Sequence, residues 1–329
     1  MIRTLRWPAG VLAVAVLLAP TAWAGDIGID HVMKGNVLKY SQPIGHLTPL
    51  GTDMHTWGED IPSDVDWHRI MEPSTQPLPP NWIIADDFRD PFDTPVLTVR
   101  WWGSYVGPTF GPGPEGPMPI FGPGSEDGYL ISFFKDIPAN PDAGIPFSMP
   151  GELLGSYAVS FDKVWVEPTP YIGWDQEEIY EYKANLMDAH LDHASDLAGP
   201  MGFNQRAGEI YWISIVAEVG HKLSLVEDAT GNVVWVEEPT GKMAMPNPEN
   251  EEGHYWGWHT SPIRFNDIAT MGHLIMPGNE WQYFNWQPIQ PKHELLDMAF
   301  ELYTVPEPAS ALLIGLVLVA AGGLRLRFV

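Results

Sequence analysis

The chain has 329 residues, 33 prolines and 32 glycines, no cysteine, and a formal net charge of −25. The lack of cysteine excludes thiol catalysis, disulfides and cysteine-ligated zinc, and the many prolines and glycines favour short strands over long helices. The negative charge argues against nucleic acid or an anionic membrane surface as a partner.

Residues 1–24 have the three parts of a secretory signal peptide. Arg3 and Arg6 give a positive start, an uninterrupted apolar run follows, and Ala22–Ala24 supplies a small-x-small cleavage site. The run is too short to span a bilayer as a permanent helix. A helix buried in the domain would have polar residues interrupting the apolar run, and none is present. We therefore predict export and cleavage before Gly25 by signal peptidase.

Residues 25–304 are predicted to form one all-β domain, a single β-sandwich of the jelly-roll kind with long Gly/Pro-rich loops. Residues 25–80 are Pro-rich and are expected to form an irregular arm packed on the sheets. Alternating, β-branched and aromatic segments predict the strands. These segments are 81–86, 95–106, 129–137, 152–159, 163–166, 179–186, 209–219, 222–226, 233–237, 262–267 and 295–304.

Three clustered acids, Asp86, Asp87 and Asp90, come at the end of the first predicted strand. Clustered carboxylates in a loop after a strand are typical of Ca²⁺ sites in extracellular β-sandwiches. The spacing differs from that of an EF-hand loop, and an Asp-Asp pair at a strand end is also a common cap. Calcium is the cofactor that this cluster suggests.

Aromatic residues are abundant in the strand segments, and the chain contains 15 tryptophans. An indole face matches the flat apolar face of a pyranose ring, so an exposed row of them would bind a glycan. Strand alternation sends about half of such residues into the core instead. The candidates for a glycan-binding face are Trp101, Trp102, Tyr105, Trp256 and Trp258.

Residues 107–128 hold seven glycines and six prolines and are expected to be a loop. A loop of this length in a compact domain has a function or lacks order.

A second candidate metal site contains Asp188, His190 and His193, with Asp192 and Asp196 beside them. Imidazoles three residues apart share one face if this segment forms a helical turn. The segment lacks an H-E-x-x-H pattern, and a solvated acidic loop is the alternative.

The C-terminus carries Val305–Pro308 (Val-Pro-Glu-Pro), then sixteen uncharged residues, 309–324, and then Arg325 and Arg327. A helix of that length reaches about 24 Å, slightly less than a hydrocarbon core. The terminal arginines would stay in the cytoplasm and leave the domain outside the inner membrane. Hydropathy alone would support a permanent C-terminal anchor.

This three-part ending resembles the PEP-CTERM sorting signal. The resemblance implies that Pro306, Glu307 and Pro308 are recognised by an exosortase-type membrane protease. The helix would then be inserted only transiently in the inner membrane, and the processed protein would reach the cell surface or the extracellular matrix. Without residues 1–24 and 306–329 the chain keeps 13 Lys and Arg against 41 Asp and Glu, a formal charge of −28.

The central part resembles an uncharacterised family of secreted bacterial domains that often end in a PEP-CTERM tail. The resemblance spans residues 37–304, and its most recognisable segments are Arg100–Tyr105 (RWWGSY) and Ile210–Ile215 (IYWISI). It implies one continuous exported domain and assigns no activity.

The sequence thus predicts a non-enzymatic cell-surface or matrix protein that binds exopolysaccharide or another envelope component. One alternative is a glycan hydrolase or lyase with two opposed carboxylates, which 41 acids neither exclude nor identify. The other is a purely structural surface protein. No G-x-S-x-G elbow, P-loop or dinucleotide fingerprint is present.

Overall fold

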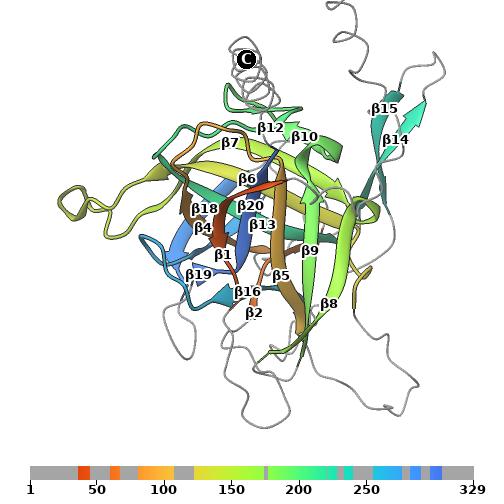
Figure 1. The fold of residues 1–329 in the computed structure, drawn as a ribbon, viewed down its shortest axis with the longest axis horizontal. Coiled ribbons are helices and arrows are strands. Elements are labelled where there is room, and N and C mark those ends of the chain that lie inside the picture. Colours follow the sequence, from red (N-terminus) through yellow and green to blue (C-terminus); the bar gives the residue numbers. More distant parts are fainter. Residues whose placement is uncertain are drawn as a thin grey trace, which may run out of the picture. The chain divides into compact units, whose positions relative to one another are not determined.

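The computed structural model describes residues 36–44, 60–66, 81–106, 122–173, 177–219, 221–227, 233–239, 255–275, 282–289 and 297–305. Within these ranges the regular structure is almost entirely strand (Figure 1). The only helical elements there are single 3₁₀ turns, η2 (Pro141–Ala143), η3 (Phe161–Lys163) and η4 (Leu186–Asp188). No helix in the described part of the chain is long and apolar enough to cross a bilayer.

Two eight-stranded sheets form the domain, and we call them the β5 sheet and the β6 sheet after a central strand of each. The β5 sheet contains β1 (Val37–Gln42), β2 (Asp60–Pro62), β5 (Thr98–Val106), β8 (Val164–Ile172), β9 (Glu178–Asn185), β16 (Tyr255–Ser261), β19 (Asp297–Met298) and β20 (Phe300–Thr304). The β6 sheet contains β3 (Asp64–Asp66), β4 (Asn81–Arg89), β6 (Gly128–Ile137), β7 (Met149–Ser160), β10 (His190–His193), β13 (Ile210–Val219), β17 (Thr270–Ile275) and β18 (Gln282–Pro288). The predicted all-β sandwich is confirmed.

Two short pairs complete the described strands. β11 (Ala198–Gly199) pairs with β12 (Gly202–Phe203), and β14 (His221–Glu227) pairs antiparallel with β15 (Val233–Pro239). The segments 222–226 and 233–237 were both predicted as strands.

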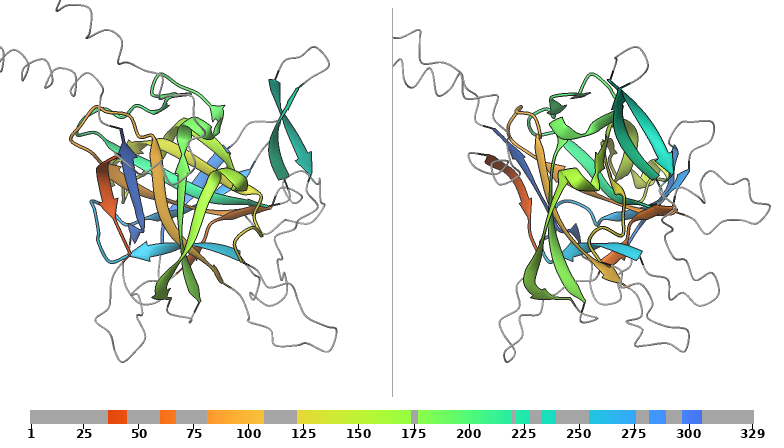
Figure 2. Two further views of the ribbon diagram at one scale, coloured as in Figure 1. Left: turned by 45° about the vertical axis from the view of Figure 1, so that its right-hand side comes forward. Right: turned by 90° about the vertical axis from the view of Figure 1, so that its right-hand side faces the viewer.

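The order of the β5 sheet follows from the partners of β5 itself. Along one edge β5 pairs with β9, which in turn pairs with β8 at the end of the sheet. Along the other edge its first half pairs with β20 and its second half with β16. The β6 sheet has a similar arrangement around β13. Along one edge the first half of β13 pairs with β4 and its last residues pair with β3, and along the other edge β13 pairs with β6. Figure 2 shows these strands from two further directions.

The main core lies between the two sheets and follows the two-residue alternation of the strands. On β5, Val99 and Trp101 face this core, whereas Arg100 and Trp102 face outward. The core is rich in aromatic rings that pack edge to face, such as Trp101 against Tyr129 with ring centroids 5.1 Å apart. Its largest fully buried side chains include Trp101, Trp258, Tyr129, Tyr157, Tyr182, Phe88, Phe133, Phe203 and Phe300.

The outer face of the β6 sheet is covered by the β17–β18 hairpin. Tyr283 of β18 packs on Phe134 of β6 with ring centroids 4.8 Å apart, and its hydroxyl is 2.9 Å from Ser132 Oγ. Because three strands, β13, β4 and β17, lie between β6 and β18 in the sheet, the hairpin must curl back over the sheet to make these contacts. Gly272 allows this close approach, since a Cβ there would lie 2.6 Å from the Trp286 ring.

Gly272→Ala is therefore expected to displace Trp286 and destabilise the domain by about 1–3 kcal/mol. Gly199→Ala is the matched control, because a Cβ at that position meets nothing within 4 Å. Urea denaturation of both variants measures the effect. Equal stability of the two would show that the aromatic cover does not depend on Gly272.

Three expectations about local structure were wrong. Residues 262–267, predicted as a strand, form an irregular segment in which Asn266 has a φ of +45°. The region 25–80, predicted as irregular, contributes β1, β2 and β3. The segment after Leu186, expected to be a loop or a single helical turn as far as Leu197, does begin with the helical turn η4, but the edge strand β10 follows, and no strand was predicted there.

Candidate functional site

A cleft of about 410 Å³ lies on the outer face of the β5 sheet. Its size falls in the range of small-molecule sites in proteins. Strands β5, β8, β9 and β20 and the segment after β1 provide its walls. The lining residues are Pro43, Ile44, Arg100, Trp102, Glu167, Pro168, Thr169, Pro170, Tyr171, Glu181 and Glu301.

One wall of the cleft is an irregular stretch of β8. Pro168 pairs with Tyr180 but Ile172 pairs with Glu178, so β8 holds two extra residues between these pairs. Prolines cannot donate to a strand ladder, and β8 is an edge strand where such an irregularity is tolerated. The prolines of the Val-Glu-Pro-Thr-Pro sequence therefore explain why the strand bulges here.

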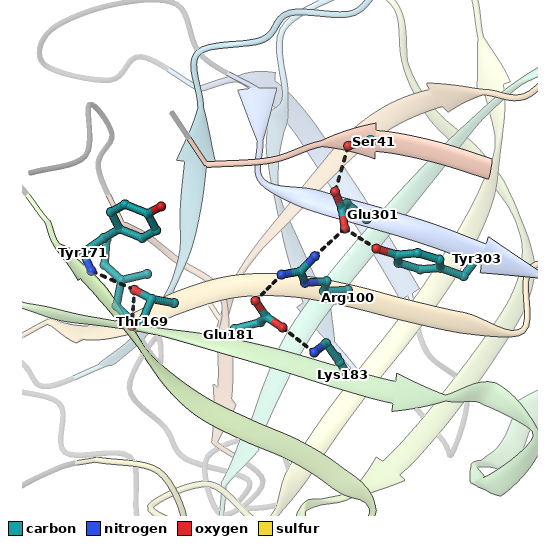
Figure 3. Close-up of polar contacts among 9 residues, drawn as sticks. Ser41, Arg100, Thr169, Tyr171, Glu181, Lys183, Glu301 and Tyr303 are labelled. Atoms are coloured by element: carbon teal, nitrogen blue, oxygen red, sulfur yellow. Dashed lines mark hydrogen bonds and ion pairs between the residues drawn. The ribbon is translucent and has the colours of Figure 1, made fainter. Parts of the chain in front are cut away.

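Thr169 holds the bulge in place. Its hydroxyl donates to the carbonyl of Ile179 at 2.8 Å and accepts from the backbone N–H of Tyr171 at 3.2 Å (Figure 3). Tyr171, which packs on Trp102, Ile44, Ile179 and Ala299, thereby lines the cleft.

The floor of the cleft is a row of charged side chains from adjacent strands (Figure 3). Arg100 on β5 donates through Nη1 to Glu301 on β20 at 2.9 Å and through Nη2 to Glu181 on β9. Lys183 Nζ lies 2.5 Å from the other oxygen of Glu181. The three strands are neighbours. Arg100 pairs in register with Glu301 and Lys183, and Glu181 lies two residues before Lys183 on β9, so strand pairing brings the row together.

Further hydrogen bonds fix the carboxylate of Glu301. Ser41 on β1 donates to its Oε1 at 2.8 Å, and the hydroxyl of Tyr303 donates to its Oε2. The Nε of Arg100 is buried and makes no hydrogen bond within the described residues.

Two aromatic rings lie beneath the cations of this row. The Arg100 guanidinium is 4.6 Å from the centroid of the Trp102 ring, and Lys183 Nζ is 3.8 Å from that of Trp165. Cation–π contacts of this kind hold a long side chain in one orientation. Trp102 is only 3% exposed, so it supports Arg100 and presents little surface of its own.

The charges in the row stabilise one another. Burial raises the pKa of Glu181, but hydrogen bonds and charges from Arg100 and Lys183 outweigh that effect and leave the pKa below its ordinary value. Burial lowers the pKa of Arg100, whereas Glu181, Tyr303 and Glu301 raise it, with a net increase. Glu181 is consequently an ionised acceptor at neutral pH.

The predicted glycan-binding aromatic residues do not form one exposed face. Trp101, Trp256 and Trp258 are at most 3% exposed and pack between the sheets, because their strand positions point inward. Tyr105 also points inward, and its hydroxyl donates to Glu126 at 2.6 Å. Of the five, only Trp102 lines the cleft.

Asp86, Asp87 and Asp90 are buried and do not form a common site. Asp90 pairs with Lys39 on β1 at 2.6 Å. Asp86 accepts from Gln42 and from the backbone of Met298, and Asp87 accepts from Asn266 at 2.7 Å. No group of three His, Asp or Glu side chains within the described ranges is placed to hold a metal ion.

The second candidate metal site depended on helical spacing, and this premise is wrong. His190 and His193 lie in β10, with a register irregularity between Leu191 and His193, and Asp188 lies in the preceding 3₁₀ turn. Asp188, His193, Asp192 and Asp196 are exposed, and His190 is half-buried.

The predicted processing sites and the predicted basic tail lie outside the described residues, as does most of the 107–128 loop. The processing sites are Ala22, Ala24, Gly25, Pro306, Glu307 and Pro308, and the basic tail contains Arg325 and Arg327.

Sequence reasoning identified Trp102 but missed the charged residues of the cleft, because their significance depends on strand pairing. Arg100, Glu181 and Glu301 are separated by 80 residues or more along the chain, and each has an ordinary strand context. The available signal was the Arg-Trp-Trp run, in which an outward cation is followed at i+2 by an outward aromatic residue.

The fold and the cleft define an all-β sandwich with a polar, aromatic-walled cleft on one outer face. A family model, Domain of unknown function (DUF7901), matches residues 38–303, and the chain belongs to this family. Comparisons with curated proteins and with solved structures gave no match.

Proposed function

We propose that this domain is an exported carbohydrate-binding module of the cell surface or extracellular matrix, and that the cleft on the β5 sheet binds its glycan. The main observation that supports this proposal is the Glu181–Arg100–Glu301 row on the cleft floor beside Tyr171. Sugar hydroxyls both donate and accept, and this row offers guanidinium donors next to carboxylate acceptors in fixed positions.

The wall of the cleft complements the floor. Tyr171 and the two prolines of β8 provide the apolar surface that the C–H face of a sugar ring requires. Three carboxylates and one arginine line the cleft, so a neutral glycan fits it better than a uronate or sulfated one. The same balance disfavours nucleic acid.

The proposed localisation outside the cell is based on the sequences at the two ends of the chain. The signal peptide and the PEP-CTERM-like tail would take the domain across the inner membrane and, after exosortase-type cleavage, to the surface or matrix, where exopolysaccharide is present. Transient membrane insertion through the C-terminal segment precedes that release.

Binding is favoured over hydrolysis by the ionisation of the cleft. A glycosidase needs one protonated carboxyl beside the scissile bond, with a raised pKa. Arg100 and Lys183 instead lower the pKa of Glu181. The buried acids with raised pKa values, Asp86, Asp87, Glu126 and Asp297, do not line the cleft.

Arg100→Met is expected to abolish glycan retention in affinity electrophoresis of the purified full chain on a panel of neutral polysaccharides. The substitution removes two charge-assisted donors from the floor, a loss that lowers affinity by about tenfold or more. Arg206→Met is the matched control, since Arg206 is an exposed arginine outside the cleft.

Tyr171→Ala tests the wall of the cleft independently of the charged residues on its floor. A thermal unfolding transition like that of the original protein would show that Arg100→Met and Tyr171→Ala are folded. Retention of Arg100→Met and Tyr171→Ala equal to that of the original protein would place binding elsewhere. Lack of retention of every variant and of the original protein on all glycans would contradict the proposed function.

A further inference from the structure

One carboxylate of the cleft stands in an electrostatically unfavourable position. Glu167 on β8 pairs in register with Glu181 on β9, so both side chains leave the same face of the sheet. Like charges directly opposite each other on neighbouring strands are destabilising. A structural role for Glu167 in the sheet does not account for a glutamate at this position.

The other two cleft carboxylates are neutralised, and Glu167 is not. Glu181 is held by Arg100 and Lys183, and Glu301 by Arg100, Ser41 and Tyr303. Glu167 is exposed and makes no ion pair with any described residue. The cleft therefore offers a free anionic acceptor on its rim, next to the bulge that carries Tyr171.

We propose that the cleft selects a glycan carrying a free amino group, a de-N-acetylated hexosamine, whose ammonium binds Glu167. An ammonium has three donors and supplies Glu167 with the counter-charge that the described residues do not provide. The hydroxyls of the same sugar then lie over the Arg100 row. An N-acetylated sugar has no positive charge to place beside Glu167, and the carboxylate of an acidic sugar would be repelled by Glu167.

The pairing of charges across the cleft supports this assignment. The outward side chains form two rows across the strands, Glu301–Arg100–Lys183 and Trp102–Glu181–Glu167. Ion pairs within and between these rows give every charged side chain a partner except Glu167. This inference rests on the proposed function and specifies the class of sugar.

The test compares three tetrasaccharides of matched length: β-1,4-linked glucosamine, N-acetylglucosamine and glucose. Titrations of the purified full chain at pH 6 and at about 150 mM salt suppress long-range attraction to the acidic surface. We expect the glucosamine tetramer to bind about tenfold more tightly than the other two.

Glu167→Gln is expected to remove that preference, so that the glucosamine tetramer binds no more tightly than the two neutral tetramers. Glu152→Gln is the matched control, because Glu152 is an exposed glutamate on β7 of the other sheet and its loss changes the net charge equally. An equal loss of preference in both variants would assign the effect to overall acidity and overturn the proposal.

The remaining outcomes separate this inference from the proposed function. Equal binding of all three tetramers by the original protein would overturn the amino-sugar preference and leave glycan binding in place. Failure of all three to bind, together with failure of the neutral polysaccharides, would overturn both.

Discussion

Lys39→Met is expected to destabilise the domain by about 3–5 kcal/mol, because it leaves Asp90 buried without its counter-ion. Lys39 Nζ lies 2.6 Å from Asp90 Oδ2, and the two side chains are 1% and 0% exposed. The ammonium also donates to Thr94 Oγ1 at 2.7 Å. The pair fastens β1 to the end of β4, and β1 leads directly into Pro43 and Ile44 of the cleft.

Urea denaturation measures this effect, with Lys39→Met/Asp90→Asn as the informative second variant. The asparagine keeps an acceptor for the backbone N–H of Phe92, which Asp90 binds at 3.0 Å, and removes the uncompensated charge. The double variant should be more stable than Lys39→Met. A loss under 1 kcal/mol in Lys39→Met, or a double variant as unstable as the sum of the single ones, would contradict a buried, coupled pair.

The second large effect concerns the three buried acids Asp86, Asp87 and Asp297, which meet where β4 and β19 approach each other. Burial raises the pKa of Asp87 to about 8 and that of Asp297 to about 7, and burial with the neighbouring acids raises that of Asp86 as well. One carboxyl oxygen each of Asp87 and Asp297 is buried and makes no hydrogen bond among the described groups. A proton bound to these acids in the folded state removes the repulsion between their charges and lowers the cost of burying them.

These raised pKa values make stability depend on pH. Between about pH 4 and pH 8 the folded state binds protons that the unfolded state has released, so the contribution of these acids to the free energy of unfolding falls as pH rises. Asp297→Asn keeps an acceptor for the backbone N–H of Phe265 and cannot ionise. Between about pH 5 and pH 7, we expect the free energy of unfolding to fall with rising pH by about 1 kcal/mol per pH unit less in the variant than in the original protein. At pH 8 the variant should be the more stable of the two.

Urea denaturation at unit steps of pH checks this expectation, with Asp142→Asn, a change at an exposed aspartate of η2, as the control. A difference between Asp297→Asn and the original protein that does not change with pH would show that Asp297 ionises as readily in the folded state as in the unfolded one.

The fold was predictable where the sequence has a two-residue period. β5, β6, β9 and β13 all carry inward aromatic or β-branched side chains at alternate positions, and all four were predicted. The short strands β2 and β3 were missed because three residues carry no period, and their partners are more than 150 residues away.

The candidate site was less predictable than the fold. The tryptophans that suggested a glycan-binding face are mostly core residues, and only the register of a strand decides on which side of the sheet an indole lies. The carboxylates of the cleft are three among 42 acids. Only the pairing of β20, β5, β9 and β8 distinguishes Glu301, Glu181 and Glu167 from the others.

The most direct test of glycan binding in the cleft is isothermal titration of the purified full chain with the glycan that it retains most strongly, beside Arg100→Met and Arg206→Met. The proposed function predicts saturable binding at one site per chain, preserved in Arg206→Met and lost in Arg100→Met. Saturable binding that Arg100→Met retains unchanged, or no saturable heat with any glycan, would contradict it.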